Sequence, residues 1–147
     1  MPNEELLVEI LECQHGTKVG HITLNSPETL NSLTMNMVNK ISNLLDDWEV
    51  DPQIKMVLLS GAGEKAFCAG GDIRALYESM CSPEGPIFAE SFFESEYRLD
   101  YKLHNFSKPI VSLLDGIVMG GGAGLMFSSS YKIATERTKF AMPEIGV

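Results

Sequence analysis

The sequence contains few cysteines, no excess of basic residues and no long apolar run. Its three cysteines are too few and too scattered for a disulfide framework, which favours a reducing compartment. The 11 Lys and Arg residues are outnumbered by 20 Asp and Glu, and the formal net charge of -9 disfavours binding to nucleic acid or to an anionic membrane. No apolar segment approaches the roughly 20 residues of a membrane-spanning helix. We therefore expect neither a nucleic-acid partner nor a membrane partner.

The N-terminal residues lack the marks of a targeting sequence. They do not combine a basic start with an apolar segment, as a signal peptide does, and they are acidic where a transit peptide is rich in arginine. We expect a cytoplasmic protein, with a mitochondrion or another organelle as the alternative in a eukaryote.

Several catalytic motifs are also missing. The sequence has no C-x-x-C pair or other metal-ligating cluster, neither glycine fingerprint of the nucleotide-binding loops, and no G-x-S-x-G elbow. The three histidines, His15, His21 and His104, have no serine or cysteine spaced to suggest a catalytic triad. We expect no metal and no cofactor.

What is present fits one globular α/β domain. The chain has 147 residues, 44% of them hydrophobic, which is enough for a single sizeable core. Strands are predicted at residues 6–12 and 19–24, joined as a hairpin, and at 54–60, 66–68, 109–114 and 131–135. Helices are predicted from a cap at Thr34 to about 51, over 73–80 and 88–106, and from the glycine run 120–124, with a loop at 81–86.

Two of the apolar segments end in a glycine-rich turn that starts a helix, at residues 69–72 and 120–124. Glycine allows a ligand to approach the main chain, and the N–H groups of a first helical turn attract a negative oxygen. If Gly71 and Gly121 face one another, their N–H groups form an oxyanion hole. For either turn alone, tight turning and close helix packing are the commoner reason for the glycines.

Three carboxylates are candidates to work beside such a hole. Glu144 lies between apolar neighbours, where desolvation would raise its pKa towards that of a working acid or base, although a surface glutamate fits the pattern equally. Glu96 lies near Phe92 on the long helix, but the pattern favours a solvated or salt-bridged side chain. Asp72 is favoured as a helix cap, and Cys68 as a small core residue.

The sequence resembles the crotonase, or enoyl-CoA hydratase/isomerase, superfamily in four motifs that occur in the family's order. These motifs are TLNSP at 23–27 with LNSLT at 30–34, AFCAGGD at 66–72, DGIVMGGG at 115–122 and FAMPE at 140–144. The resemblance implies an α/β, crotonase-like spiral of repeated ββα units with helices packed around the sheets. It implies one such domain over residues 1–147, truncated at its C-terminal side, because proteins of this family are considerably longer.

Within the superfamily the chain is most similar to the 3-hydroxyisobutyryl-CoA hydrolase branch. The similarity covers residues 66–74, 92–97 and 120–125. Similar enoyl-CoA hydratases carry a first catalytic glutamate at the position of Gly124, whereas the hydrolase branch has glycine there. The two-glutamate hydratase mechanism is therefore in doubt. The hydrolase branch also uses an aspartate in a Phe-Pro-Asp stretch, which would lie beyond Val147.

The resemblance assigns roles to individual residues. It implies that Gly71 and Gly121 are the oxyanion donors, that Glu144 is the principal catalytic carboxylate, and that Glu96 contacts the acyl part of the substrate. The implied coenzyme A surface consists of the loop 25–33, Ala69 and the segment Gly71, Asp72, Ile73 and Arg74, with Lys65 or Arg74 near the phosphates.

The resemblance implies a thioester hydrolase that acts on a short 3-hydroxyacyl-CoA, as in valine breakdown. Glu144 would either activate water or attack directly to form a mixed anhydride, and the sequence leaves both routes open. An enoyl-CoA hydratase/isomerase and a non-catalytic CoA-binding protein are the alternatives. An acyl-CoA is the expected partner, and a homo-oligomer is left open.

Overall fold

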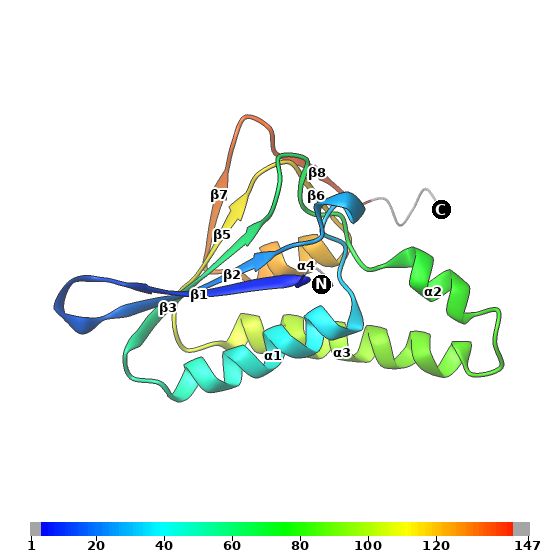
Figure 1. Ribbon diagram of the computed structural model, residues 1–147, viewed down its shortest axis with the longest axis horizontal. Coiled ribbons are helices and arrows are strands. Elements are labelled where there is room, and N and C mark those ends of the chain that lie inside the picture. The colour runs from blue at the N-terminus through cyan, green and yellow to red at the C-terminus, as the bar shows by residue number, and fades with distance from the viewer. Residues whose placement is uncertain (1–3, 143–147) are drawn as a thin grey trace.

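A computed structural model describes residues 4–142 of the chain (Figure 1). Its strands are β1 (Leu6–Glu12), β2 (Lys18–Leu24), β3 (Ile54–Gly61), β4 (Ala66–Cys68), β5 (Ile110–Leu114), β6 (Ile117–Met119), β7 (Tyr131–Ala134) and β8 (Lys139–Ala141). The helices are α1 (Met35–Val50), α2 (Ile73–Ser79), α3 (Gly85–Asn105) and α4 (Gly121–Ser128), with short 3-10 turns at Gln14–Gly16 and Pro27–Thr29.

The strands form two sheets, one of five strands and one of three. The larger sheet has the order β1-β2-β3-β5-β7, with β1 antiparallel to β2 and the other neighbours parallel. The smaller sheet has the order β4-β6-β8 and is parallel throughout. Each consecutive pair, β3–β4, β5–β6 and β7–β8, gives one strand to each sheet. This arrangement confirms the predicted spiral of ββα units.

The first helix shows how local sequence sets the packing. The Thr34 hydroxyl accepts a hydrogen bond from the Met37 N–H at 3.1 Å, so the predicted cap is confirmed. Apolar residues at spacings of three and four, among them Val38, Ile41 and Leu45, are then buried on one face. Figure 1 shows α1 and α3 alongside one another, on the same side of the larger sheet.

One predicted element boundary is wrong, and short strands were missed. Helix α3 begins at Gly85, so the predicted loop over residues 81–86 ends earlier than expected. Pro86 lies in the first turn, where the missing N–H leaves no hydrogen bond unmade, and proline therefore starts the helix instead of preventing it. Strands β6 and β8 were not predicted, because three residues seldom show a period.

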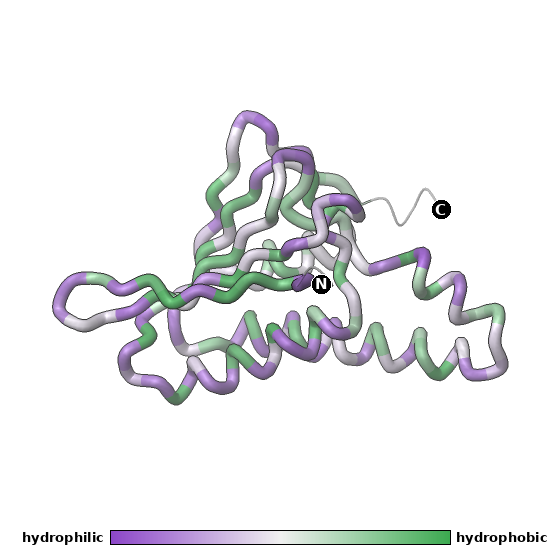
Figure 2. Tube along the Cα trace, in the orientation of Figure 1, coloured by the Kyte–Doolittle hydropathy of each residue, from purple (hydrophilic) through white to green (hydrophobic). Residues whose placement is uncertain are grey.

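The hydrophobic core lies between the larger sheet and the helices. Its most deeply buried large side chains include Ile22, Ile41, Phe67, Phe92 and Leu99. Figure 2 shows hydrophobic residues along the strands and hydrophilic residues at the tip of the β1–β2 hairpin. In the described residues no helix is both long enough and apolar enough to cross a membrane.

Candidate active site

The structure brings the two predicted glycine loops together. Strands β4 and β6 are parallel neighbours, so their carboxyl ends, and the turns that follow them, lie at the same edge of the smaller sheet. A side-chain carbon built on Gly70 would lie 3.6 Å from the backbone nitrogen of Gly121. The loop that carries Gly71 therefore lies directly beside the first turn of α4.

The backbone around Gly71 is fixed by its neighbours. The Leu33 N–H donates to the Gly70 carbonyl at 2.7 Å, and the Asp72 N–H donates to the Leu33 carbonyl at 2.9 Å. These two bonds hold the loop on both sides of Gly71 without using its own N–H. Among residues 4–142, the Gly71 N–H donates no hydrogen bond.

The backbone N–H of Gly121 belongs to the first turn of α4. First-turn N–H groups have no partner within their own helix, and no side chain from the described residues 4–142 caps α4. The preceding residue, Gly120, has φ 49° and ψ -123°, a conformation that glycine adopts readily. The geometry is therefore compatible with two free donors, at Gly71 and Gly121, on adjacent loops.

The residues predicted to form the coenzyme A surface lie around the Gly71 loop. Asn31 holds the loop 25–33 in place, because its amide donates to the carbonyls of Ala62 and Ala66 at 2.9 and 2.8 Å. The Ala69 N–H donates to the Leu30 carbonyl at 3.0 Å. Ile73, Arg74 and Lys65 are exposed, so their side chains are accessible to a ligand.

Asp72 has a structural role that the sequence predicted. Its carboxylate accepts a hydrogen bond from the Ala75 N–H at 3.0 Å and caps α2. Cys68 is likewise a buried core residue, as expected, and burial raises the pKa of its thiol to about 12. Cys68 is therefore a neutral thiol at physiological pH.

Glu96 does not have the solvated environment that its sequence pattern favoured. Its residue exposure is only 5%, and its side chain packs against α4. A side-chain carbon on Gly121 would overlap Glu96 Oε1, so the two helices approach this closely only because residue 121 is glycine. The prediction of a surface glutamate is wrong for this physical reason. The structure places Glu96 beside one of the two predicted donors.

Asp100 joins this arrangement and was missed in the sequence. It lies one helical turn beyond Glu96, and its carboxylate oxygens are 2.5 and 2.8 Å from the position of a side-chain carbon on Gly124. Glu96 Oε1 and Asp100 Oδ1 are buried and have no hydrogen-bond partner among the described residues. The spacing of four residues on one helix was the available signal, because such residues share a face.

The pKa values of both carboxyl groups are raised. Burial, reinforced by the charge of Glu96, raises the pKa of Asp100 to about 7. Burial also raises the pKa of Glu96. A proton is therefore held on this pair well above the pH at which an exposed carboxyl group loses it.

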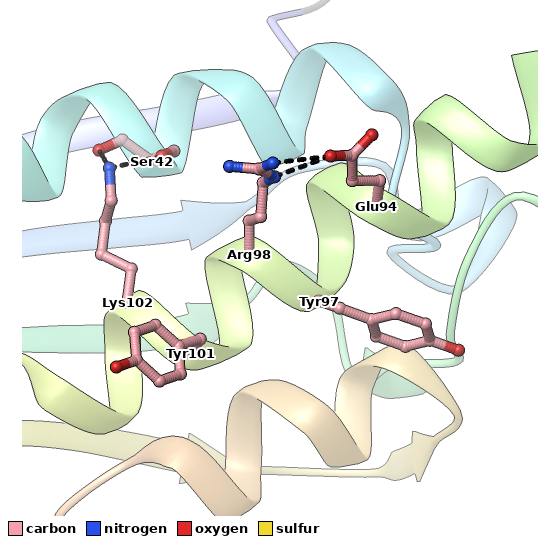
Figure 3. Close-up of a pocket in the computed structure, with 6 residues that line it drawn as sticks. All are labelled: Ser42, Glu94, Tyr97, Arg98, Tyr101 and Lys102. Atoms are coloured by element: carbon pink, nitrogen blue, oxygen red, sulfur yellow. Dashed lines mark hydrogen bonds and ion pairs between the residues drawn. The ribbon is translucent and has the colours of Figure 1, made fainter.

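One hollow in the surface borders the Gly71 loop, whereas a broader one lies elsewhere. A cavity of about 220 Å³ lies beside Gly71, between α2, α3 and the start of α1, with Asp72, Leu76 and Phe92 in its wall. A broader depression of about 880 Å³ lies over the exposed face of α3 and contains no predicted site residue. Figure 3 shows Arg98 turned towards Glu94 there, and Lys102 reaching Ser42 on α1.

A second polar cluster lies across the larger sheet. His21 Nε2 is 2.8 Å from Ser60 Oγ, and His21 Nδ1 is 3.4 Å from Glu9 Oε2. The Thr23 hydroxyl is also 3.0 Å from Ser60 Oγ. The spacing in the sequence did not suggest this grouping, because the residues come from three different strands. The serine oxygen is engaged on two sides, as expected of a structural network.

One predicted catalytic residue cannot be placed. Glu144 lies outside the described residues, so its prediction remains untested by the structure. Over residues 4–142, no three His, Cys, Asp or Glu side chains are grouped as metal ligands.

Comparison with known proteins shows the family to which this fold belongs. A family model described as enoyl-CoA hydratase/isomerase matches residues 19–147. The chain belongs to this family, the crotonase superfamily, so the resemblance seen in the sequence is confirmed.

Two curated relatives share a more particular name. The chain is 48% identical over 130 residues to "3-hydroxyisobutyryl-CoA hydrolase, mitochondrial" of Danio rerio, covering 88% of this chain and 34% of the relative. It is 44% identical over 144 residues to the human protein of the same name, covering 98% and 36%. The chain thus spans about a third of these relatives' length.

Solved structures with this fold carry other names. A carnitinyl-CoA dehydratase from Mycobacterium thermoresistibile superposes with a TM-score of 0.89 at 44% identity, covering 99% of this chain and 41% of that one. An enoyl-CoA hydratase from Rhodobacter sphaeroides gives 0.81 at 38% identity, covering 93% and 40%.

Proposed function

We propose that the protein is a thioester hydrolase of short 3-hydroxyacyl-CoA esters, with 3-hydroxyisobutyryl-CoA of valine breakdown as its substrate. The observation that carries this proposal is the similarity to relatives named 3-hydroxyisobutyryl-CoA hydrolase, at 44 to 48% identity. Gly124 supports it, because glycine supplies no second carboxylate for the addition of water to a double bond.

The proposed chemistry starts at the two glycine loops. The thioester carbonyl oxygen would accept hydrogen bonds from the N–H groups of Gly71 and Gly121, which stabilise the charge that develops on it. Glu144 would take a proton from water, whose oxygen forms the new bond to the carbonyl carbon. The C–S bond then breaks, a proton passes to the sulfur, and the products are the free hydroxyacid and CoA thiol.

Binding of the anionic CoA portion requires local cations. The net charge of -9 repels such a ligand at long range, so attraction depends on backbone N–H groups and on a few side chains. Lys65 and Arg74 are exposed near the Gly71 loop and are proposed for this role. No resident cofactor is proposed, because CoA is part of the substrate.

Release of CoA thiol tests the proposal. The full natural polypeptide is incubated with 3-hydroxyisobutyryl-CoA and a thiol reagent, and Glu144→Gln is measured in parallel. We expect steady thiol release by the wild type and a fall of about 100-fold or more in Glu144→Gln, because general acid–base groups contribute about 10² to 10⁴-fold. Unchanged turnover in Glu144→Gln would refute the assigned chemistry.

An enoyl-CoA hydratase or related lyase is the second candidate. The similarity to a solved carnitinyl-CoA dehydratase at 44% identity favours it. A lyase interconverts hydroxyacyl-CoA and enoyl-CoA without releasing thiol, so following both thiol and the conjugated double bond separates the two activities. CoA binding with neither reaction would instead support a non-catalytic binding protein.

The names of the relatives also bear on location. Both carry the word mitochondrial, which supports the organellar alternative over the cytoplasmic expectation. We propose a mitochondrial location, to be tested by imaging the full natural polypeptide with a C-terminal tag.

A further inference from the structure

The contact between α3 and α4 places two carboxyl groups side by side. Glu96 and Asp100 are one turn apart on α3, and each packs against a glycine of α4, at positions 121 and 124. The glycines are also one turn apart, so the two pairs are in register. A larger residue at either glycine would displace the carboxyl group that faces it.

Both carboxyl groups have unused hydrogen-bonding capacity. Glu96 has only 5% exposure, and its Oε1 has no partner in the described part of the chain. Asp100 Oδ1 is buried and equally unpartnered within residues 4–142. Such groups are costly to bury, and a ligand that supplies the missing bonds is one way to recover the cost.

The neighbouring cations do not neutralise the pair. On α3 itself, Arg98 bonds to Glu94 and Lys102 bonds to Asp46. From β4 the pair faces the Cys68 thiol, and from α4 it faces glycines that carry no charge. The site therefore favours a ligand group that is neutral and polar.

We propose that Asp100 is a further specificity-determining residue of this site, which binds, together with Glu96, a hydroxyl group on the acyl portion of the substrate. The inference rests on the proposed function for its choice of an acyl-CoA ligand. A hydroxyl group has one donor and two acceptor lone pairs. It can donate to the Glu96 carboxylate while it accepts from a protonated Asp100.

The protonation of Asp100 fits its proposed role as the hydrogen-bond donor, with Glu96 as the acceptor. The pKa of Asp100 is raised to about 7 by burial and by the charge of Glu96, so a protonated Asp100 is available near neutral pH. Among residues 4–142, the titratable groups that face it from the packed elements are Glu96 and Cys68, and the thiol stays neutral because its pKa is raised to about 12.

The test compares two ligands that differ by one hydroxyl group. Hydrolysis-resistant thioether analogues of 3-hydroxyisobutyryl-CoA and isobutyryl-CoA are titrated by calorimetry into the full natural polypeptide. The variants are Asp100→Ala, Asp100→Asn and the control Glu94→Ala, which removes an exposed acid from the same helix. Binding is read without turnover, so failure to hydrolyse the natural ester would overturn only the proposed function.

We expect Asp100→Ala to lose about tenfold or more of the preference for the hydroxylated ligand, which is the typical effect of deleting one such hydrogen bond. Asp100→Asn should retain most of the preference, since its amide still donates, and Glu94→Ala should leave the preference unchanged. An unchanged ratio of affinities in a folded Asp100→Ala would overturn the proposal.

A pH series keeps the proposal testable if Asp100→Ala does not fold. In the wild type the preference for the hydroxylated ligand should fall as the pH rises through about 7, because Asp100 loses its donor proton. In Asp100→Asn the preference should not change over the same range. The same pH dependence in both proteins would show that Asp100 does not bind the hydroxyl group.

Discussion

The two glycine loops have the same order of elements but opposite surroundings. After β4, helix α2 is capped by its own Asp72 and buries only Leu76, while Ile73 is 69% exposed. After β6, helix α4 buries Gly122, Ala123, Leu125 and Met126 and has no side-chain cap from the part of the chain that the structure describes. The first loop is supported by hydrogen bonds and lies open to a ligand, whereas the second is enclosed by packing.

The two loops also differ in the atoms that an added side chain would meet. At Gly71 the nearest atoms to an added side-chain carbon are the ring atoms of Phe92 at 3.0 and 3.2 Å, and such a ring can shift. At Gly122 the nearest atom is the Cys68 carbonyl oxygen, with Cys68 Cβ at 2.8 Å, and backbone cannot move aside as easily. We therefore expect an added side-chain carbon to be tolerated better at Gly71 than at Gly122.

This difference between the loops is tested most directly by comparing the stability of Gly122→Ala with that of Gly71→Ala. We expect Gly122→Ala to lower the free energy of unfolding by about 3 kcal/mol, the upper end for overpacking, because it meets backbone. Gly71→Ala should lower it by about 1 kcal/mol, since the Phe92 ring relaxes. Urea unfolding followed by circular dichroism gives both values. Equal losses would remove the proposed difference between the loops.

The carboxyl pair beside α4 predicts a pH effect on stability. The folded pKa of Asp100, about 7, lies above the ordinary value of 3.8, so the folded state retains a proton that the unfolded state loses. Stability should therefore fall as the pH rises from about 4 to 7 and then level off.

Asp100→Asn removes this penalty. We expect a gain of about 2 kcal/mol at pH 8, with a discount for the partial exposure of Asp100, and almost none at about pH 2, where Asp100 is protonated in both states. Unfolding measured at the two pH values checks this. A gain of equal size at both would mean that ionisation of Asp100 is not the cause.

The cap of α2 should matter less. Asp72→Ala removes the bond to the Ala75 N–H and should lower the free energy of unfolding by about 1 kcal/mol. Asp72→Asn is the control, because asparagine caps nearly as well. Thermal unfolding compares the two, and a larger loss in Asp72→Asn would argue against capping.

The smallest effect is expected where the turn between β7 and β8 contacts the turn between β5 and β6. Arg137 donates to Asp115, and this hydrogen bond lowers the pKa of the aspartate below its usual value. The stabilisation is present above the unfolded pKa and is lost as the pH falls through the folded one. Arg137→Ala should therefore lower the melting temperature slightly at pH 7 and not at all at strongly acidic pH. A drop that persists in acid would point to packing instead.

The sequence predicted the elements better than it predicted the site. The β1–β2 hairpin, α1 with its Thr34 cap and strand β5 follow from local patterns of two and 3.6 residues. The environments of Glu96 and Asp100 depend on how α3 crosses α4, and no local pattern contains that information. Glutamate on a helix surface is usually solvated, so only the three-dimensional contact with Gly121 reveals that Glu96 is buried.

The order of the strands has a consequence for how the protein is made. In both sheets the strands from β2 onward follow one another outward in the order in which they leave the ribosome. Each unit can dock on an edge that is already complete, and no early strand has to wait for a later one to be inserted beside it. Folding during synthesis can therefore proceed by successive additions, which shortens the time that apolar strands such as β3 and β5 remain exposed to aggregation.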